Sequence, residues 1–353
     1  MRPFKIKVLS DFAWLFGGIG MSTQLFVVIT VDTEDSQRPA VVYDNKVEEL
    51  DTMVYGYING NLYGFTKIIE ICDGFGCKAT FFVSVFDCGK YGEDAIAAIC
   101  RLIKQRGHDI QLHTHPRRVY DKARREMYKY SFEEQVRIVK DGAGLIRKWV
   151  DESPVAHRAG AYGLNEDTIK SLRENNIRID SSMFYGYPNC KLTWSRNRVV
   201  ERDGILEIPV TGFFREKAVY LMGIPVWRRR SFVKTDIDAA SLDELKFFAE
   251  EARRHDIRVM NLFMHSYSFI RFNADFTHFE PDYEDIEKFE RFLEYATADP
   301  SIRFVTIREL FEIYQKDPGS LLDGSDYVPI RRYQVNIADK IKRRFLSRVS
   351  KKC

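Results

Sequence analysis

The chain has 353 residues, of which 45% are hydrophobic and 30% charged. This composition excludes a largely disordered protein and predicts a sizeable core. The formal net charge of +3 gives no reason to expect a nucleic-acid partner, and no apolar run approaches the roughly 18 residues of a membrane span.

Two features of the sequence bear on where the protein works. The six cysteines include no CxxC pair, and several fall in segments with the pattern of a core. We therefore predict free, buried thiols and a cytoplasmic, reducing location. Residues 1–22 are first basic and then apolar, but Asp11 interrupts the apolar run and no small-residue cleavage site follows. We expect a poorly ordered N-terminal extension rather than a signal peptide.

From Leu25 onward, strand patterns alternate with helix patterns. Apolar runs predict strands over 25–31, 78–85, 155–158, 177–181, 206–210, 258–265 and 302–307, and a further strand ends in His113 and His115. Helical spacing predicts helices over 62–72 and 92–105, and the capping-box pairs Ser131/Glu134 and Ser241/Glu244 open two more. The alternation predicts a single catalytic domain over 23–318, a distorted TIM-like (β/α) barrel of about seven strands rather than an open sheet.

In such a barrel, chemistry belongs at the carboxyl ends of the strands. The first strand ends in Asp32, Glu34 and Asp35. Three carboxylates directly after a buried strand are costly unless a cation or a titration role accounts for them. A solvated acidic turn is the alternative interpretation.

His113 and His115 are the second group. Residues i and i+2 of a strand face the same way, so the two imidazoles are expected to lie side by side. An isolated HxH sequence is more often a pair of surface or hydrogen-bonded histidines. Together with one carboxylate, however, two imidazoles form a common catalytic zinc set that leaves positions open for water and substrate.

Three further strand ends carry candidate residues. Arg158 precedes small residues and could place a fixed cation beside the carboxylates. His265 ends an apolar strand, and Asp180 ends another and is a candidate partner for a histidine or an arginine. Each of these residues alone is more typical of a structural role, so only their combination indicates a functional site.

These motifs, in this order, resemble the polysaccharide deacetylase family, the NodB-homology group of carbohydrate esterases. The resemblance covers about 25–314 and rests on Asp32-Thr33-Glu34, Lys78 to Val83, Gly107 to His115, Arg158, Asp180-Ser181-Ser182 and Leu262 to His265. It implies metal-dependent removal of acetyl groups, usually from N-acetylated sugars.

The resemblance implies a divalent metal, Zn²⁺ first and Co²⁺ or Ni²⁺ as alternatives. Its ligands would be His113, His115 and a carboxylate, either Glu34 or Asp35. The common family pattern has adjacent aspartates and a histidine pair separated by three residues, whereas this chain matches a subgroup with D-T-E and H-x-H-P. That subgroup is expected near surface-polysaccharide biosynthesis.

The resemblance also implies the acid–base residues. Asp32 would take a proton from water, Arg158 would hold Asp32 ionised, and His265 would protonate the leaving amine. Asp180 would support a neighbouring charged group. Backbone N–H groups near 161–162 would help to bind the oxyanion.

Two segments point to partners. Residues 185–236 are rich in aromatic and basic side chains, including Arg228 to Arg230. They are compatible with a region that recognises an anionic glycan or a phosphate-linked sugar carrier, and equally with an ordinary long surface loop packed on the barrel. The tail, 319–353, becomes strongly basic from Arg331 and has apolar residues every four positions. An amphipathic helix on an anionic membrane and a solvated basic tail are both compatible with it.

Three functions remain open on these grounds. The first is a de-N-acetylase acting on a surface polysaccharide or its precursor. The second is a hydrolase of another non-peptide C–N bond on the same scaffold. The third is a barrel that has lost catalysis and only binds glycan. The sequence indicates no oligomeric state.

Overall fold

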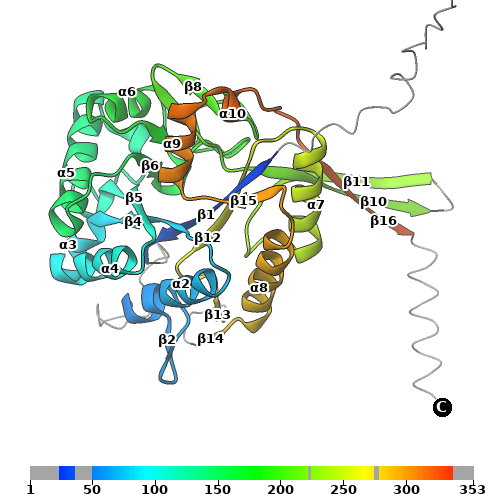
Figure 1. The fold of residues 1–353 in the computed structure, drawn as a ribbon, viewed down its shortest axis with the longest axis horizontal. Coiled ribbons are helices and arrows are strands. Elements are labelled where there is room, and N and C mark those ends of the chain that lie inside the picture. Colours follow the sequence, from blue (N-terminus) through cyan, green and yellow to red (C-terminus); the bar gives the residue numbers. More distant parts are fainter. Residues whose placement is uncertain (1–23, 36–49, 222–223, 274–277, 337–353) are drawn as a thin grey trace, which may run out of the picture.

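A curled, mainly parallel sheet forms the centre of the protein in the computed structural model, which describes residues 24–35, 50–221, 224–273 and 278–336 (Figure 1). The strand order is β12-β1-β4-β5-β6-β7-β9-β8, and β15 also pairs with β1. The bounds are β1 (Leu25–Thr33), β4 (Thr80–Ser84), β5 (Asp109–Thr114), β6 (Ala156–Ala159), β7 (Ile179–Asp180), β8 (Val200–Arg202), β9 (Ile205–Glu207), β12 (Val259–His265) and β15 (Ile302–Phe304). Only β8 is antiparallel to its neighbour, so the predicted α/β class and distorted TIM-like barrel are confirmed.

Helices cover the outside of this sheet (Figure 1). Their bounds are α2 (Phe65–Gly74), α3 (Cys88–Tyr91), α4 (Glu93–Gln105), α5 (Phe132–Val150), α6 (Glu166–Glu174), α7 (Leu242–Arg254), α8 (Tyr283–Thr297), α9 (Ile307–Lys316) and α10 (Gly319–Leu322). Both predicted capping boxes are present, since Ser131 and Ser241 accept hydrogen bonds from the backbone N–H groups of Glu134 and Glu244. These bonds satisfy N–H groups that a helix start otherwise leaves unpaired.

Smaller elements complete the chain. Two short hairpins pair β2 (Tyr57–Ile58) with β3 (Asn61–Leu62) and β13 (Ile270–Phe272) with β14 (Phe279–Pro281). Single helical turns cover Asp51–Tyr55, Val85–Asp87, Pro116–Arg118, Met127–Lys129 and Gly160–Tyr162.

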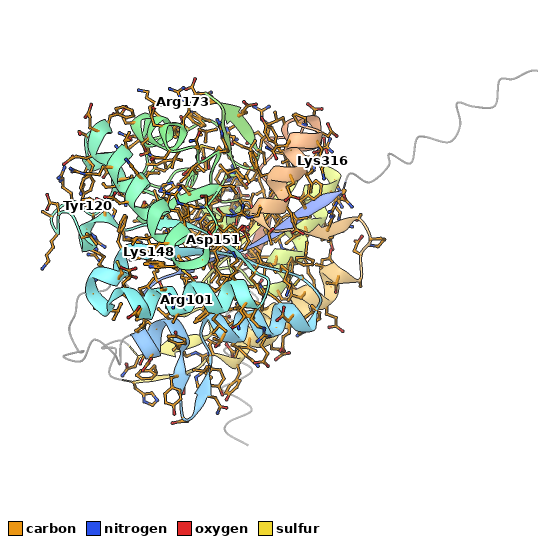
Figure 2. The ribbon with its side chains drawn as sticks, turned by 60° about the vertical axis from the view of Figure 1, so that its left-hand side comes forward. Arg101, Tyr120, Lys148, Asp151, Arg173 and Lys316 are labelled. Carbon is orange, nitrogen blue, oxygen red and sulfur yellow. The ribbon has the colours of Figure 1, made fainter. Side chains whose placement is uncertain are left out.

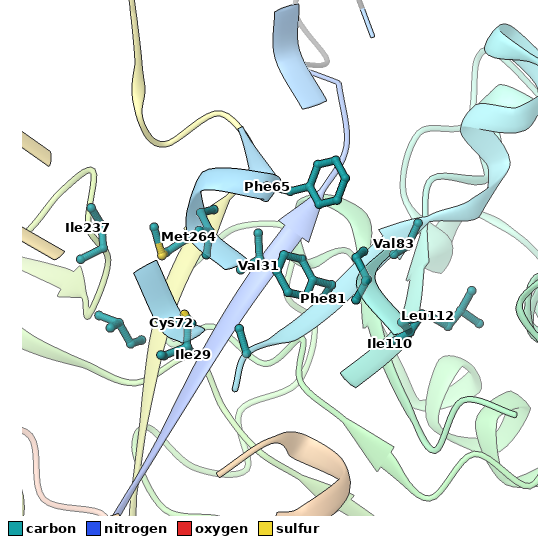
Figure 3. Packing of buried hydrophobic residues seen from close by; sticks show 14 of the residues in the cluster. Ile29, Val31, Phe65, Cys72, Phe81, Val83, Ile110, Leu112, Ile237 and Met264 are labelled. Carbon is teal, nitrogen blue, oxygen red and sulfur yellow. The ribbon is translucent and has the colours of Figure 1, made fainter. Parts of the chain in front are cut away.

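The alternation of side chains along β1 separates two buried layers. Ile29 and Val31 face outward with Phe81 of β4 and pack against α2, where Phe65 and Cys72 lie (Figure 3). The alternate residues of β1 face inward. Among them, Phe26 and Val28 pack in a second buried cluster with residues of α9. The inward layer becomes polar toward the carboxyl ends of the strands, with Thr30 and Asp32 next in line.

Side chains join the two edges of the barrel where the main ladder stops. Among the described residues, β12 and the segment after β9 are bridged by Thr211, Thr235 and Asn261. The Thr235 hydroxyl donates to the Asn261 carbonyl at 2.7 Å, and the backbone N–H of Asn261 donates to the Thr211 hydroxyl at 2.9 Å. The Thr30 hydroxyl of β1 donates to the Asn261 side chain at 2.7 Å. These fully buried polar groups are therefore paired with one another.

A second sheet was not foreseen from the sequence. Strands β10 (Gly212–Leu221) and β11 (Ile224–Lys234) form a long antiparallel hairpin, and β16 (Ile330–Asn336) runs parallel to β10 on its other side. The sheet extends away from the barrel (Figure 1). Helix α10 and strand β16 fall within the segment assigned above to the tail, whereas 337–353 and the N-terminal segment 1–22 lie outside the described residues.

Two sequence expectations can be compared directly with the described residues. None of the helices there is long and apolar enough to cross a membrane. The five described cysteines are all free, and Cys72, Cys77 and Cys100 are buried, as predicted. Cys353 lies outside the described part of the chain.

Candidate metal centre and active site

Three predicted ligands converge at the carboxyl ends of β1 and β5. Glu34, His113 and His115 are buried, and one ligand atom from each lies within 4.8 Å of the other two. The His115 Nε2 atom is 2.6 Å from Glu34 Oε2 and 3.1 Å from His113 Nε2, while His113 Nε2 is 3.5 Å from Glu34 Oε2. The expectation that i and i+2 face the same way on β5 therefore holds for the two imidazoles.

A backbone contact fixes the tautomer of His113. Its Nδ1 atom is 2.9 Å from the carbonyl oxygen of Arg158. A carbonyl can only accept, so Nδ1 carries the proton and donates. In the neutral imidazole the Nε2 lone pair is then free and points toward the carboxylates, which is the arrangement of a metal-binding histidine held by an outer hydrogen bond.

Gly160 makes room for His115. A Cβ atom added to Gly160 would lie 2.3 to 2.7 Å from the Cε1, Nδ1 and Nε2 atoms of the His115 ring. This glycine follows β6 directly, and its φ is not among the positive values of the chain. Space rather than backbone freedom is thus the reason for a glycine at this position.

The donor set fits a small divalent cation. Two nitrogens and one carboxylate oxygen are a familiar catalytic zinc set. Donors bound at about 2.0–2.1 Å in a tetrahedral arrangement lie roughly 3.3 Å apart, and the separations of 2.6, 3.1 and 3.5 Å bracket that value. A cation would also compensate the buried negative charge of Glu34. Burial raises the pKa of this carboxyl, but His115 and His113 outweigh burial and hold the pKa well below its usual range.

Asp32 lies beside this group and is held by Arg158. The guanidinium donates from Nη1 to Asp32 Oδ1 at 2.7 Å, from Nε to the Ser181 carbonyl at 2.9 Å and from Nη2 to the Thr30 hydroxyl at 3.1 Å. Arg158 is fully buried and lies over the ring of Phe82, with 4.1 Å between its Cζ atom and the ring centroid. Burial raises the pKa of Asp32, but Arg158, followed by His113 and His265, outweighs burial and lowers it.

His265 is the last residue of β12, the strand that pairs with β1. It pairs in register with Asp32 across β1 and β12. Its ring stacks on Tyr267 with centroids 4.8 Å apart, and its Nδ1 atom is 3.6 Å from Asp238 Oδ2. The side chain is 21% exposed. His265 therefore lies at the open edge of the site with a carboxylate behind it.

Two predicted site residues lie apart from the ligand group. Asp35 accepts hydrogen bonds from Lys90 at 2.9 Å and Tyr91 at 2.8 Å, and Arg118 also binds it. Of the two alternative carboxylate ligands, the structure thus brings Glu34 and not Asp35 to the histidines. The reason is that side chains one position apart at a strand end point to opposite sides.

Asp180 also faces away from the centre. Its Oδ1 atom is 2.7 Å from His157 Nδ1 and accepts from the Ser182 hydroxyl at 2.9 Å. The Ser182 hydroxyl in turn accepts from the Ala159 backbone N–H at 2.8 Å. Asp180 therefore supports the strand ends that carry Arg158, and the side chain next to it is the His157 imidazole.

The sequence did not reveal Lys234, Asp236 and Asp238 as residues near the site. Lys234, at the base of β11, is 3.1 Å from the Tyr162 hydroxyl, forms an ion pair with Asp236 at 2.5 Å and lies over the Phe263 ring at 3.5 Å. Asp238, beside His265, is the third. The local sequence carries no clear signal, because only two apolar residues lie between the three arginines of β11 and Lys234.

Solved structures share this fold. A protein of Mycobacterium smegmatis assigned as a polysaccharide deacetylase aligns with a TM-score of 0.54 and 16% identity, over 85% of this chain and 93% of its own. One of Pseudomonas aeruginosa PAO1, assigned likewise, gives 0.53 and 11% over 84% and 92%. The allantoinase Puue gives 0.52 and 12% over 84% and 92%. No protein-family model and no curated protein matches the sequence. At these identities the likeness establishes a common fold.

Proposed function

We propose that this protein is a metal-dependent hydrolase of the polysaccharide deacetylase family, and that it removes acetyl groups from the N-acetylated sugars of a surface polysaccharide or its precursor. The observation that carries the proposal is the buried group of Glu34, His113 and His115 directly beside the Asp32–Arg158 pair. The fold of the two assigned deacetylases supports it.

Glu34 and the Nε2 atoms of His113 and His115 would hold the metal. Zn²⁺ is the first candidate for this donor set, with Co²⁺ and Ni²⁺ as alternatives. Such an ion, when bound, lowers the pKa of water toward neutrality and polarises a carbonyl. Gly160 and the Arg158 carbonyl would keep the two imidazoles oriented toward it.

Asp32 would act as the general base. Its Oδ1 atom is occupied by the Arg158 guanidinium, so Oδ2, which is 3.8 Å from His113 Nε2, is the oxygen that would accept a proton from the attacking water. The lowered pKa keeps this carboxylate ionised at neutral pH. Arg158 acts through Asp32 and is a positioning residue.

His265 would supply the proton that the leaving amine requires. Its position at the open edge, with the Asp238 carboxylate 3.6 Å from Nδ1, suits an imidazole that carries a proton and releases it from the other nitrogen. The oxyanion would bind backbone N–H groups near Ala161 and Tyr162. Both have left-handed φ values, of 51° and 56°, and such strain of about 1–3 kcal/mol per residue is typical of functional turns.

Metal analysis and acetate release test the proposal together. We expect about one divalent metal per purified chain, lost in His113→Ala and retained in His255→Ala, a control that removes a histidine outside the site. A panel of N-acetylated oligosaccharides and nucleotide sugars should yield acetate with the wild type, and Asp32→Asn should release at least about 100-fold less, as expected for loss of a general base. A metal-free wild type would contradict the proposal.

The fold of an allantoinase favours a second candidate, hydrolysis of another non-peptide C–N bond. On that reading the purified chain binds the metal but releases no acetate from any sugar. A barrel that only binds glycan would bind sugars with neither metal nor acetate release. The two measurements above therefore separate all three functions.

A further inference from the structure

The outer half of the β10–β11 hairpin has a surface that neither the site nor the barrel uses. We propose that this half, residues 216–221 and 224–230, is a docking surface for an anionic lipid bilayer. The inference goes beyond the proposed function and does not depend on it.

Positive charge is concentrated in the second sheet. Its three strands carry eight cationic residues and one acidic residue, a net charge of +7, whereas the whole chain carries +3. The remainder of the chain is therefore at −4. A charge separation of this kind indicates a surface that binds an anionic partner.

The charges at the base of the sheet are compensated, and those further out are not. Arg215 pairs with Glu244 and Lys234 with Asp236, while Arg230 pairs with Glu216 at 2.6 Å halfway along. In the described part of the chain no carboxylate lies within ion-pair distance of the further cations, which are Lys217, Arg228 and Arg229. The uncompensated cations thus lie in the outer half of the hairpin, directly beyond the Arg230–Glu216 pair.

Apolar side chains are exposed at the same end. Ile224 is 66% exposed, Val226 52% and Trp227 47%. Arg228 and Arg229 follow them directly in β11 and are also exposed. Exposed aliphatic residues and a tryptophan beside arginines are typical of segments that lie at a membrane interface, because the apolar groups enter the acyl boundary while the cations meet lipid phosphates.

Strand β16 ends beside the outer half of the hairpin. Asn336, its last residue, is in register with Tyr220 near the hairpin turn. The sequence that follows, 337–353, has a net charge of +6. The sheet itself extends from the barrel, so its outer end can approach a flat surface (Figure 1).

Two other occupants fit less well. A substrate bound at the site is too far from this surface. Arg228 lies six residues along β11 from Lys234, which borders the site, and six residues of a strand span about 20 Å. A second copy of the chain could add to the free edge of β11, but its own Arg228, Arg229 and Arg230 would then face those of the first copy, and opposed like charges destabilise strand pairing.

Sedimentation of the full chain with vesicles tests the inference. We expect binding to phosphatidylcholine vesicles that contain about 30% phosphatidylglycerol and little binding to phosphatidylcholine alone. Arg228→Glu/Arg229→Glu should weaken the partition coefficient at least about tenfold, and Ile224→Ser/Trp227→Ser about tenfold, from the loss of cation–phosphate and apolar contacts. These side chains are exposed, so thermal unfolding should be unchanged.

The matched control reverses two charges elsewhere. Arg173 of α6 and Lys316 of α9 are exposed and lie on the barrel (Figure 2). Arg173→Glu/Lys316→Glu changes the net charge by the same amount and should bind within about twofold of the wild type. A chain that ends at Asn336 should still bind anionic vesicles, and its binding should still depend on the hairpin.

Several results would overturn the inference. One is a wild type that does not sediment with anionic vesicles. Another is equal weakening by the control and the hairpin variants, which would indicate net charge alone. A third is binding lost on truncation at Asn336 but kept in both hairpin variants, which would assign it to the tail. A fourth is self-association that the hairpin variants abolish without any vesicle binding, which would assign the surface to a second copy.

Discussion

Gly160→Ala should weaken metal binding without removing a ligand. The added Cβ would lie 2.3 Å from the nearest His115 ring atom, about 1.1 Å short of the 3.4 Å at which ordinary contact begins. The ring must therefore move by roughly 1 Å, whereas metal–ligand distances tolerate about 0.2 Å. Loss of groups that orient a metal ligand weakens binding about 10- to 100-fold, so we expect a loss of about 1.4 to 2.7 kcal/mol of binding free energy.

Competition with a chelator measures this loss. The metal dissociation constants of wild type, Gly160→Ala and His115→Ala are compared, and the last sets the effect of losing the ligand outright. Gly144→Ala is the matched control, because a Cβ at this position in α5 meets nothing within 4 Å. It should bind metal as the wild type does.

The reasoning would be refuted by a Gly160→Ala protein whose dissociation constant stays within about twofold of wild type. Equal weakening by Gly144→Ala would also refute it. Cooperative unfolding of the metal-free Gly160→Ala chain distinguishes a displaced ligand from a misfolded barrel.

Three further predictions concern stability. Arg158→Met leaves the Asp32 carboxylate buried without its cation, and we expect the free energy of unfolding in urea to fall by about 3–5 kcal/mol. The double variant Arg158→Met/Asp32→Asn should recover a large part of this loss, and no recovery would contradict the pairing. Phe65→Ala removes a fully buried ring and should cost about 3–5 kcal/mol, with a loss under about 1 kcal/mol counting against the packing described. Burial lowers the pKa of His108 to about 4. The unfolded chain therefore binds the proton more tightly, and stability from this group is lost as pH falls from about 6.5 to about 4, by at most roughly 3 kcal/mol. In His108→Gln, the free energy of unfolding should depend less on pH over this range than in the wild type. If the difference in unfolding free energy between the two proteins stays constant across the range, the effect is excluded.

The barrel could be predicted because all its strands except β8 carry their own signal. β1 and β12 are continuous apolar runs that end in polar residues, and α5 opens with a capping box. Local patterns of this kind need no knowledge of the rest of the chain. The same holds for His113 and His115, whose common face follows from the strand period alone.

The second sheet could not be predicted in the same way. β11 has polar and charged residues at successive positions, Arg228 to Ser231, which is not the pattern of a half-buried strand. The third strand of this sheet, β16, pairs with β10, comes about a hundred residues later and also carries charged residues at successive positions. Pairing between such distant segments depends on tertiary structure, and this is also why Lys234 and Asp238 were missed as neighbours of the site.

The choice between Glu34 and Asp35 needed the structure for a similar reason. Either carboxylate suits a metal by its chemistry. Asp35 points to the opposite side from Glu34, and there two cations bind it. Lys90 and Arg118 come from a helix and a turn far along the chain, and their approach to Asp35 depends on how those elements pack.

The position of β1 has a consequence for the order in which the chain folds. β1 is the first described strand, yet its neighbours include β12 and β15, and Thr30 bonds Asn261 across 231 positions. During synthesis, one edge of β1 stays unpaired until most of the chain has left the ribosome. Such long-range pairing slows folding and leaves a strand edge open to wrong partners. Asp32 and His265 meet only at that late step, so a prematurely ended chain has the proposed metal ligands but only one member of the proposed acid–base pair.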